Sequence, residues 1–455
     1  MAKYKAYSEY RDSGVEWLGN VPTKWLITEL KRYSWVKGGY AFASDLFISF
    51  GEPVIRIGDI SQDGSINLAN CKYVSRTIAK QSQSYIVQNG ELLMAMTGAT
   101  IGKAGFYENK SPALINQRVG LFKTLDKLMN YRFLWYTLKS SGYQEYIKLT
   151  AFGGAQPNIS DAGMVGYRTT IPSLQEQVFI ASFLDNETAK IDSLIEKQQQ
   201  IIELLKEKRQ AVISHAVTKG LNPDVPMKDS GVEWLGTIPK HWSIWKLFHA
   251  YDTIGSGTTP TSNDENWFQG NIPWVTTGEL RENIINNTLK NISTVTLQSF
   301  SALKLYPAGS IIIAMYGATI GRIGILGVDA TTNQACCAMT KSKVINNLYL
   351  KYWLQTFREN IINLSSGGGQ PNINQEKVAS LKISSPDLNE QLIIIDFLDK
   401  KTTKIDDLIS KQLQQIELLK ERRTALISAA VTGKIDVRHW RAPNEQTTAE
   451  AEVAV

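Results

Sequence analysis

The chain has few cysteines, few histidines and no long apolar run. Its three cysteines, Cys71, Cys336 and Cys337, form no CxxC pair, which argues against a disulfide framework and a structural zinc site and is typical of a reducing compartment. Its four histidines include no pair at metal-ligand spacing on a helix, so we expect no metal. The most apolar stretch, around Ile311, is far shorter than a bilayer span, and the first residues have no signal-peptide core. These absences predict a soluble cytoplasmic protein with no membrane association.

Catalytic motifs are missing as well. There is no GxSxG elbow and no Asn/Asp-Pro-Pro-aromatic tetrapeptide of the kind that adenine methyltransferases carry. The stretch GATIGKA at Gly98–Ala104 differs from a phosphate loop, because three residues instead of four separate its glycines and Ala104 follows the lysine. We therefore expect no catalytic residue and no cofactor, and any catalysis would belong to partners.

The net charge of +6 is unevenly distributed. Residues 1–172 carry 20 Lys and Arg against 13 Asp and Glu, and residues 221–386 carry 13 against 11, whereas the segments that follow each of them are slightly acidic. A basic excess in these two lobes is what a DNA-facing surface requires. Charge alone does not distinguish such a surface from a solvated one that is merely basic.

The chain is a two-fold internal repeat, which decides its organisation. DSGVEWLG at Asp12–Gly19 recurs letter for letter at Asp229–Gly236. Further matches are MTGATIGKAG with MYGATIGRIG, the dipeptide NQ, GAQPNI with GGQPNI, and IIELLKEKRQAVIS with QIELLKERRTALIS. A period of about 215 residues exceeds any solenoid unit, so this is a duplicated domain pair.

Each copy is predicted to consist of a lobe followed by a helix. The lobes have short apolar runs broken by turn signals, which indicate strands with some helix, and the capping boxes Ser173/Glu176 and Asp387/Glu390 begin the helices. The fold class is α+β, with two mixed α/β lobes separated by two long helices. The predicted segments are a first lobe at 1–172, a helix at 173–220, a second lobe at 221–386, a helix at 387–437 and a disordered tail at 438–455.

A 3.5-residue apolar period runs along both helices and predicts a coiled coil. In the first helix the seam is Ile191, Ile195, Gln198, Ile202, Leu205, Arg209, Val212 and Ala216. In the second it is Ile405, Ile409, Gln412, Ile416, Leu419, Arg423, Leu426 and Ala430. The alternative is that each helix packs on its own lobe.

The polar seam residues predict an antiparallel pair. That arrangement sets Gln198 against Arg423 and Arg209 against Gln412, whereas a parallel pair in register would stack the two arginines. The seam would span ~38 Å, about one turn of B-DNA at ~34–36 Å. Such a pair would hold the lobes over successive major-groove segments.

In the order of these motifs the sequence resembles the specificity subunits of type I restriction–modification systems over residues ~5–437. The resemblance rests on DSGVEWLG with the following Pro and Trp, GATIGK/R, NQ, QPNI, and a helix that opens with EQ and closes with ELLKE. It implies two target-recognition domains, each of which reads half of a split asymmetric sequence in double-stranded DNA. It also implies that the helices space these domains and dock two methyltransferase (M) subunits, that restriction (R) subunits join the complex, and that the chain itself catalyses nothing.

Residues that are identical in both lobes cannot distinguish two different half-sites. Shared motifs should hold structure, fit partners or touch phosphates, which position DNA without specifying it. Packing is the favoured role of Trp17 and Trp234, while the GATIGK/R loop suits phosphate contact and turn geometry equally. Lys103 and Arg322 share only their charge, which suits a phosphate. The predicted backbone contacts are Thr97, Thr100, Lys103, Thr319 and Arg322.

Base-reading residues should lie where the copies diverge, chiefly in residues 36–90 and 253–310. Alignment of Pro53 with Pro273 sets Arg56, a donor that can read guanine, opposite the short hydroxyl of Thr276. The other predicted base readers are Arg76, Lys80, Gln83, Trp267, Arg281, Asn283 and Asn286. Any one of them could instead be an exposed loop residue.

Two other functions would fit the repeat. A coiled-coil scaffold whose lobes bind protein would show the same seam, but it would leave the basic lobes unexplained. A fused restriction enzyme would need the motifs that are missing.

Overall fold

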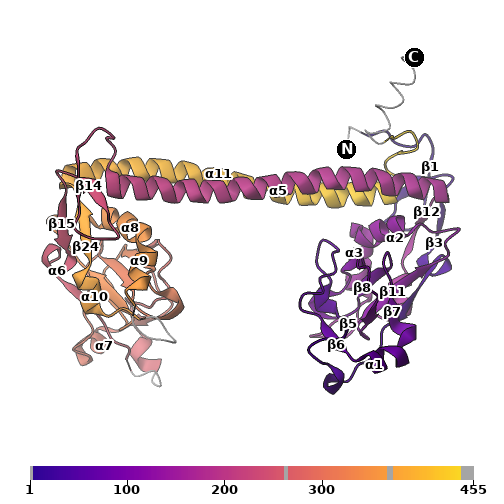
Figure 1. The fold of residues 1–455 in the computed structure, drawn as a ribbon, viewed down its shortest axis with the longest axis horizontal. Coiled ribbons are helices and arrows are strands. Elements are labelled where there is room, and N and C mark those ends of the chain that lie inside the picture. The colour runs from indigo at the N-terminus through magenta and orange to yellow at the C-terminus, as the bar shows by residue number, and fades with distance from the viewer. Residues whose placement is uncertain (1–3, 261–264, 366–371, 442–455) are drawn as a thin grey trace, which may run out of the picture. The chain divides into compact units, whose positions relative to one another are not determined.

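The computed structural model describes residues 4–260, 265–365 and 372–441. The chain divides into unit 1, residues 1–199 and 413–455, and unit 2, residues 200–412. Two long helices are α5 (Leu174–Lys219) and α11 (Leu388–Val431). Part of each helix belongs to unit 1 and the rest belongs to unit 2. Each unit is therefore a lobe together with parts of two long helices (Figure 1).

In unit 1 two four-stranded sheets, ordered β6-β5-β10-β7 and β4-β11-β8-β9, form the lobe. The strands are β1 (Tyr10–Asp12), β2 (Asn20–Pro22), β3 (Leu26–Glu29), β4 (Ser34–Gly38), β5 (Glu52–Ile55), β6 (Lys72–Val74), β7 (Ile86–Val87), β8 (Leu92–Ala95), β9 (Ala104–Phe106), β10 (Ala113–Ile115), β11 (Val119–Thr124) and β12 (Arg168–Ile171). The short helices are α1 (Arg76–Gln81), α2 (Tyr131–Lys139), α3 (Ser141–Thr150) and α4 (Asp161–Val165).

Unit 2 repeats this plan with a five-stranded sheet, β16-β23-β20-β21-β18, and a three-stranded sheet, β19-β17-β22. The strands are β13 (Met227–Asp229), β14 (Thr237–Pro239), β15 (Ser243–Lys246), β16 (Ile254–Ser256), β17 (Ile272–Val275), β18 (Ile284–Ile285), β19 (Asn291–Ile292), β20 (Ile311–Ala314), β21 (Ile323–Leu326), β22 (Thr331–Thr332), β23 (Cys336–Met339) and β24 (Lys382–Ser385). The helices are α6 (Leu247–Ala250), α7 (Thr294–Ser299), α8 (Asn347–Thr356), α9 (Arg358–Asn363) and α10 (Gln375–Ser380). The prediction of mixed α/β lobes with long helices is confirmed.

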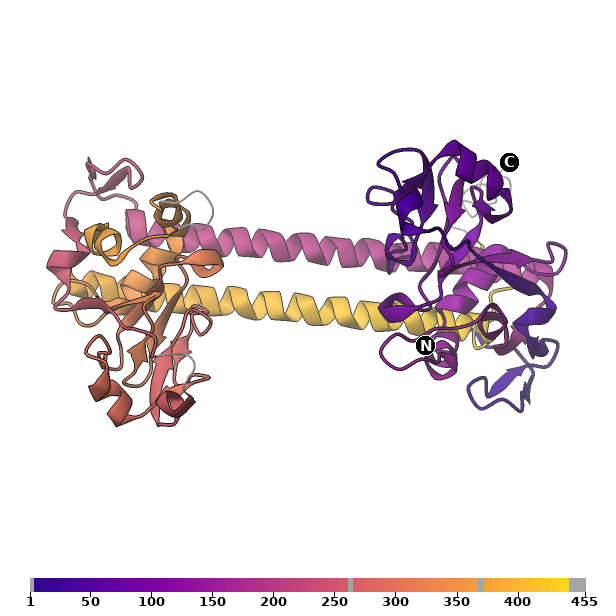
Figure 2. The ribbon, with the colours of Figure 1, turned by 90° about the horizontal axis from the view of Figure 1, so that it is seen from below.

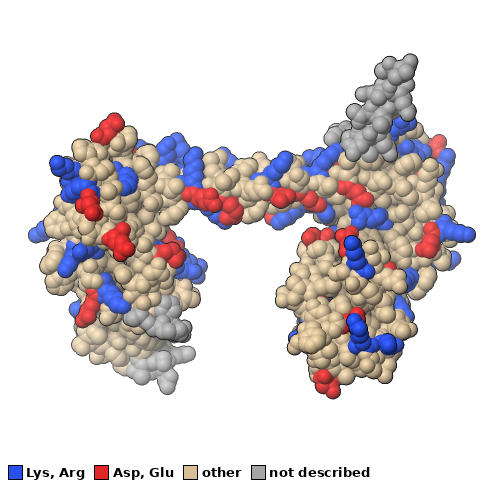
Figure 3. All heavy atoms as spheres, viewed as in Figure 1, with Lys and Arg blue, Asp and Glu red and all other residues tan. Residues whose placement is uncertain are grey.

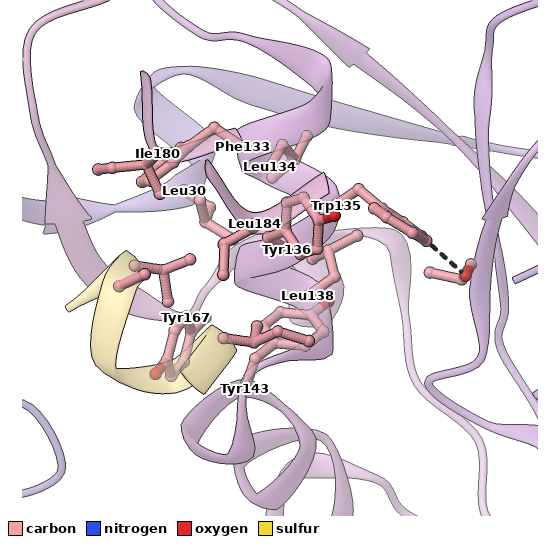
Figure 4. Packing of buried hydrophobic residues seen from close by; sticks show 14 of the residues in the cluster. Leu30, Phe133, Leu134, Trp135, Tyr136, Leu138, Tyr143, Tyr167, Ile180 and Leu184 are labelled. Atoms are coloured by element: carbon pink, nitrogen blue, oxygen red, sulfur yellow. Dashed lines mark hydrogen bonds between the residues drawn. The ribbon is translucent and has the colours of Figure 1, made fainter. Parts of the chain in front are cut away.

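The largest core of unit 1 fills the junction between the lobe and the long helices. Figure 4 shows Phe133, Leu134 and Leu138 of α2 packed with Ile180 and Leu184 of α5. Residues of α11 from Leu426 to Val431 belong to the same cluster. Because burial of aromatic and aliphatic surface supplies most of the folding free energy, this cluster fixes the lobe on the helices.

The EQ dipeptide at the start of each long helix secures this junction. The buried Gln177 side chain accepts a hydrogen bond from Asn130 N at 2.8 Å and donates to the carbonyl oxygens of Leu128 and Pro172 at 3.0 and 3.1 Å. Gln391 makes the corresponding three bonds in unit 2. The preceding glutamates, Glu176 and Glu390, accept from the indole nitrogens of Trp25 and Trp242. These duplicated residues are structural.

We expect the substitution Gln177→Leu to lower the free energy of unfolding by about 1–3 kcal/mol, because buried backbone groups lose their partners. Thermal unfolding followed by circular dichroism measures the change. The exposed neighbour Gln175, changed to Leu, is the matched control and should leave the melting temperature almost unchanged. Equal melting temperatures for the two variants would contradict the structural role of Gln177.

The long helices pair antiparallel within each unit, as predicted. In unit 1 the guanidinium of Arg423, late in α11, donates to both carboxylate oxygens of Asp192, early in α5, at 2.8 and 3.2 Å. In unit 2 Arg209, late in α5, binds Asp406, early in α11, at 2.9 and 3.2 Å. Figure 2 shows the two helices side by side.

The expected polar partners within the seam are wrong. Arg423 and Arg209 bind aspartates beside the seam instead of Gln198 and Gln412, whose side-chain carbonyl oxygens are buried without a partner among the described residues. A bidentate arginine–carboxylate pair is stronger than an arginine–amide contact, so the charged neighbours take both arginines.

The predicted seam residues of both helices are buried or half-buried in the structure. The seam residues Ile191, Ile202, Ala216, Ile405, Ile416, Leu426 and Ala430 are buried. The half-buried seam residues are Ile195, Gln198, Leu205, Arg209, Val212, Ile409, Gln412, Leu419 and Arg423. Most of the intervening helix positions are exposed, as a seam of period 3.5 requires.

The predicted tail begins too early in the sequence. Arg438 binds the carboxylate of Asp436 and lies over the Tyr7 ring, and the Trp440 ring packs edge-on against Phe183 at 5.7 Å. Aromatic and cationic side chains thus hold residues 438–441 on unit 1. The rest of the predicted tail, residues 442–455, lies outside the described residues.

Candidate nucleic-acid interface

Three duplicated motifs meet at one edge of the unit 1 lobe. The backbone N–H of Met96, which precedes the GATIG loop, donates to the carbonyl of Arg118, just after NQ, at 2.9 Å. The Ile159 N–H, at the end of QPNI, donates to Met96 O at 3.0 Å, and Gly98 N–H donates to Pro157 O at 2.8 Å. Motifs that are far apart in the sequence are therefore neighbours in space.

Arg56 lies at the same edge. Strands β5 and β10 run parallel, with Ile55 beside Ile115, so their carboxyl ends meet. Arg56 follows β5, and Asn116 follows β10 and donates its N–H to Ile55 O at 2.9 Å. We name this region, formed by residues 56, 96–98, 116–118 and 157–159, the Arg56 edge.

Unit 2 has the same edge around Thr276. Asn333 N–H donates to Val275 O at 2.9 Å, Met315 N–H to Ala335 O at 2.8 Å, and Ile373 N–H to Met315 O at 3.0 Å. We name residues 276, 315–317, 333–335, 372 and 373 the Thr276 edge. The Gln370-Pro371 part of the motif lies outside the described residues.

The two edges present different side chains on one backbone frame. The N–H of Arg56 donates to the carboxylate of Asp59 at 2.7 Å, and the N–H of Thr276 donates to that of Glu279 at 2.8 Å. Burial raises the pKa of Asp59, which the Arg56 amide and charge partly oppose. The Arg56 side chain is half-buried and its Nε is buried without a hydrogen-bond partner in the described part of the chain, whereas the Thr276 hydroxyl donates to Glu279.

Arg118 was not among the predicted base readers. Its side chain is exposed at the Arg56 edge, directly after NQ, and the matching residue in unit 2 is Ala335. The signal was present, because the duplicated NQ aligns these two positions. It was overlooked because Arg118 lies outside the long divergent segments.

Comparison with known proteins supports a DNA-reading role. The family model described as "Type I restriction modification DNA specificity domain" matches residues 22–205 and 245–418. The chain belongs to this family. The chain is similar to the putative type I restriction enzyme MjaX specificity subunit of Methanocaldococcus jannaschii, with 26% identity over 92% of this chain and 96% of that one. It is also similar to the EcoBI specificity subunit of Escherichia coli, with 24% identity over 96% and 91% of the two chains.

Solved structures share the fold. A chain from a study of assembly and conformational transition in the type I system has a TM-score of 0.66 at 16% identity, covering 91% of this chain and 99% of that chain. The HsdS subunit of Thermoanaerobacter tengcongensis has a TM-score of 0.54 at 14% identity, over 91% and 98%. As a specificity subunit, the chain is a non-catalytic component that recognises DNA targets and assembles with M and R subunits.

Three predicted base readers of this specificity subunit lie away from Arg56. Arg76 and Lys80 are exposed on α1, and Gln83 is exposed just after it. Because β6 runs antiparallel to β5, α1 begins beside the start of β5, where Arg76 is 3.5 Å from Glu52. These residues and Arg56 occupy opposite ends of one strand, and the structure does not bring them together.

Helix α7 is the counterpart of α1 in unit 2. Helix α1 follows β6, which pairs antiparallel with β5, and α7 follows β19, which pairs antiparallel with β17. A serine caps each helix, Ser75 in unit 1 and Ser293 in unit 2. Thr294 and Gln298 therefore occupy the exposed positions of Arg76 and Lys80. Neither residue was predicted as a base reader, although the serine caps align the two helices.

The predicted base readers of unit 2 differ in the exposure and contacts of their side chains. Arg281 is exposed near the Thr276 edge, where its Nε donates to Gly278 O at 3.2 Å, and Asn283 is exposed beside it. The Asn286 side chain lies against Gly327, and the Trp267 ring packs edge-on against Phe300 at 5.2 Å. Trp267 is thus half-buried in a ring contact, whereas Asn286 is exposed beside Gly327.

The predicted phosphate contacts of three threonines stay a prediction, and the structure shows how their hydroxyls are placed. The Thr97 hydroxyl is buried, and the hydroxyls of Thr100 and Thr319 donate to the carbonyls of Thr97 and Tyr316 at 3.2 Å. These hydroxyls close the turn of the glycine-rich loop. Lys103 and Arg322 end the two loops and are half-buried.

The three cysteines are free and buried. Among the described residues no three His, Cys, Asp or Glu side chains are grouped so that they could hold a metal ion. Within those residues no helix is long and apolar enough to span a membrane.

Proposed function

We propose that the Arg56 edge and the Thr276 edge read the two halves of a bipartite asymmetric DNA target. The observation that carries this proposal is that three duplicated motifs surround a position that differs, Arg56 in one unit and Thr276 in the other. A common frame can dock both lobes on DNA in the same way, while the variable side chain selects the base. Arg118 and Arg281 join the two edges as further base readers, and α1 with α7 supplies a second divergent pair.

The charge over the lobes is mixed. In the view of Figure 3, Lys and Arg side chains lie among acidic ones over each lobe and along the helices, without a large patch of one sign. Phosphate contacts therefore depend on individual cations, of which Lys103 and Arg322 are our candidates. The helices are proposed to separate the two recognition domains, at 1–172 and 221–386, and to dock two M subunits in the cytoplasm.

A binding experiment tests the proposal. We expect the chain, assembled with its M subunits, to bind a duplex carrying the methylated motif of its host, with affinity falling steeply as salt rises from 50 to 200 mM. Fluorescence anisotropy with target and scrambled duplexes measures both affinity and specificity. Equal affinity for the two duplexes would contradict sequence reading, and no binding to either would favour lobes that bind protein.

A further inference from the structure

A cationic hollow lies between the unit 1 lobe and α11. It measures about 330 Å³, and its walls come from the GATIGK loop, the end of α2, the start of α3 and α11. Three of the residues that line it are cations, Lys103, Lys139 and Arg423, and Gln62, Gln144 and Thr424 add polar groups. No acidic side chain lines it among the described residues.

Lys139 has no carboxylate partner within the described residues. Its Nζ donates to the backbone carbonyl of Asp63 and lies 4.0 Å from the centre of the Trp135 ring. The nearby carboxylates are engaged elsewhere, Asp63 with Ser65 and Asp192 with Arg423. Because a half-buried ammonium without a counter-ion is costly, an anion in the hollow would stabilise it.

The corresponding junction of unit 2 also gathers cations, from different positions. Arg322 replaces Lys103, and Arg358 lies against Gly321 where Gln144 lies against Gly102 in unit 1. Burial lowers the pKa of Lys351 on α8, the carboxylate of Asp399 opposes this shift, and the charge of Arg209 reinforces it. Cations are therefore present near this junction on residues other than those of unit 1, with the carboxylate of Asp399 beside them.

We propose that the hollow binds a phosphate group of the DNA backbone through Lys103 and Lys139, beside the ion pair of Arg423 with Asp192. The side chains must do this, because the backbone N–H groups of Ile101, Gly102 and Lys103 already donate to carbonyls of the loop and of β8. This contact would fix the lobe on the duplex without reading sequence. The inference rests on the DNA binding proposed above.

Phosphate scanning locates the contact. In the assembled complex, the target duplex is replaced by a set in which one phosphate at a time is a neutral methylphosphonate. We expect one position to weaken wild-type binding several-fold but to have no further effect on Lys139→Ala or Lys103→Ala, because the shared contact is already lost. Each variant should also reduce the salt slope by about one phosphate contact while keeping the preference for target over scrambled duplex.

The pH dependence separates a charge role from a packing role. Burial and the neighbouring Arg423 lower the pKa of Lys139 to about 8. The charged groups that face it are Lys103, Arg132, Asp63, Asp192 and Arg423. Lys139 is therefore charged at pH 7 and mostly neutral at pH 9, so target affinity of the wild type should fall about tenfold over that range. Lys139→Arg, which stays charged, should remove this dependence.

Three results would overturn the proposal. The first is a pH-independent wild type together with no methylphosphonate position masked by either lysine variant. The second is a weakening by Lys139→Ala of M-subunit assembly, measured by native mass spectrometry, with the DNA salt slope unchanged, since the hollow would then take an acidic group of a protein. The third is tight binding of inorganic phosphate that does not compete with DNA. If the wild type binds no duplex at all, the proposed function fails instead.

Discussion

The substitution Arg56→Ala should erase recognition of one half of the DNA target and leave the other half intact. A guanidinium that binds a base edge contributes about 1–3 kcal/mol of discrimination, and Arg56 lies at the edge where the duplicated motifs meet. Thr276 holds the same backbone position in unit 2, and we propose that it reads the second half-site, which the substitution leaves unchanged. Methylome sequencing of cells that carry the variant measures both halves at once.

Two further variants control this experiment. Arg76→Ala removes an arginine that is 88% exposed at the far end of β5, and we expect it to change the recognised motif less. Asp59→Asn keeps Arg56 but weakens the acceptor of its backbone N–H, so it should lower methylation without altering the motif. A motif that is unchanged in both halves in Arg56→Ala would show that Arg56 reads no base.

The paired substitution Leu194→Asp and Leu418→Asp should remove one M subunit from the complex. Both leucines belong to unit 1, are 45% and 63% exposed, and line one apolar hollow beside Leu419. In unit 2, Leu408 and Leu204 occupy the equivalent helix positions and are equally exposed. Exposed apolar side chains on a helix pair indicate a docking surface, and the M subunits are the partners that this family requires.

Native mass spectrometry of the assembled complex counts the M subunits directly. We expect one M subunit with the unit 1 pair, one with Leu204→Asp and Leu408→Asp, and none with all four changes. Gln414→Asp, at an exposed polar position of α11, is the matched control and should keep both. Circular dichroism should show full helix content throughout, and two retained M subunits in the fourfold variant would refute the docking surface.

Much of the architecture could be predicted because the sequence contains two copies of the same domain pair. The seam, the capping boxes and the antiparallel pairing follow from local periodicity and from the offset of Gln198 and Arg209, which need no knowledge of the lobes. The family is recognisable for the same reason. The seam partners were predicted wrongly because Asp192 and Asp406 lie beside the seam, and only side-chain geometry shows that they reach the arginines.

The candidate site was harder to predict because it is made by strand pairing. That Arg56 lies beside Asn116 depends on β5 and β10 running parallel, a long-range contact that carries no periodic signal. The hydroxyls of Thr100 and Thr319 were difficult to assign for a different reason. A polar residue in a glycine-rich loop suits a ligand contact and a turn equally until its hydrogen bonds are known. Lys103 could be predicted because Arg322 carries the same charge at the matching position of the second copy. Nothing in the sequence indicated that Lys139 and Arg423 lie near it.

The division of the chain sets the order in which it is completed during synthesis. Unit 2 is a continuous stretch, residues 200–412, whereas unit 1 needs both ends of the chain. Its largest core includes Leu426, Ile427 and Ile435, and Tyr10 donates a hydrogen bond to Gly433 O. The lobe that leaves the ribosome first is therefore finished last, with part of its core exposed until the final helix arrives. In this specificity subunit the second recognition domain can be ready while the first still waits for the end of the polypeptide.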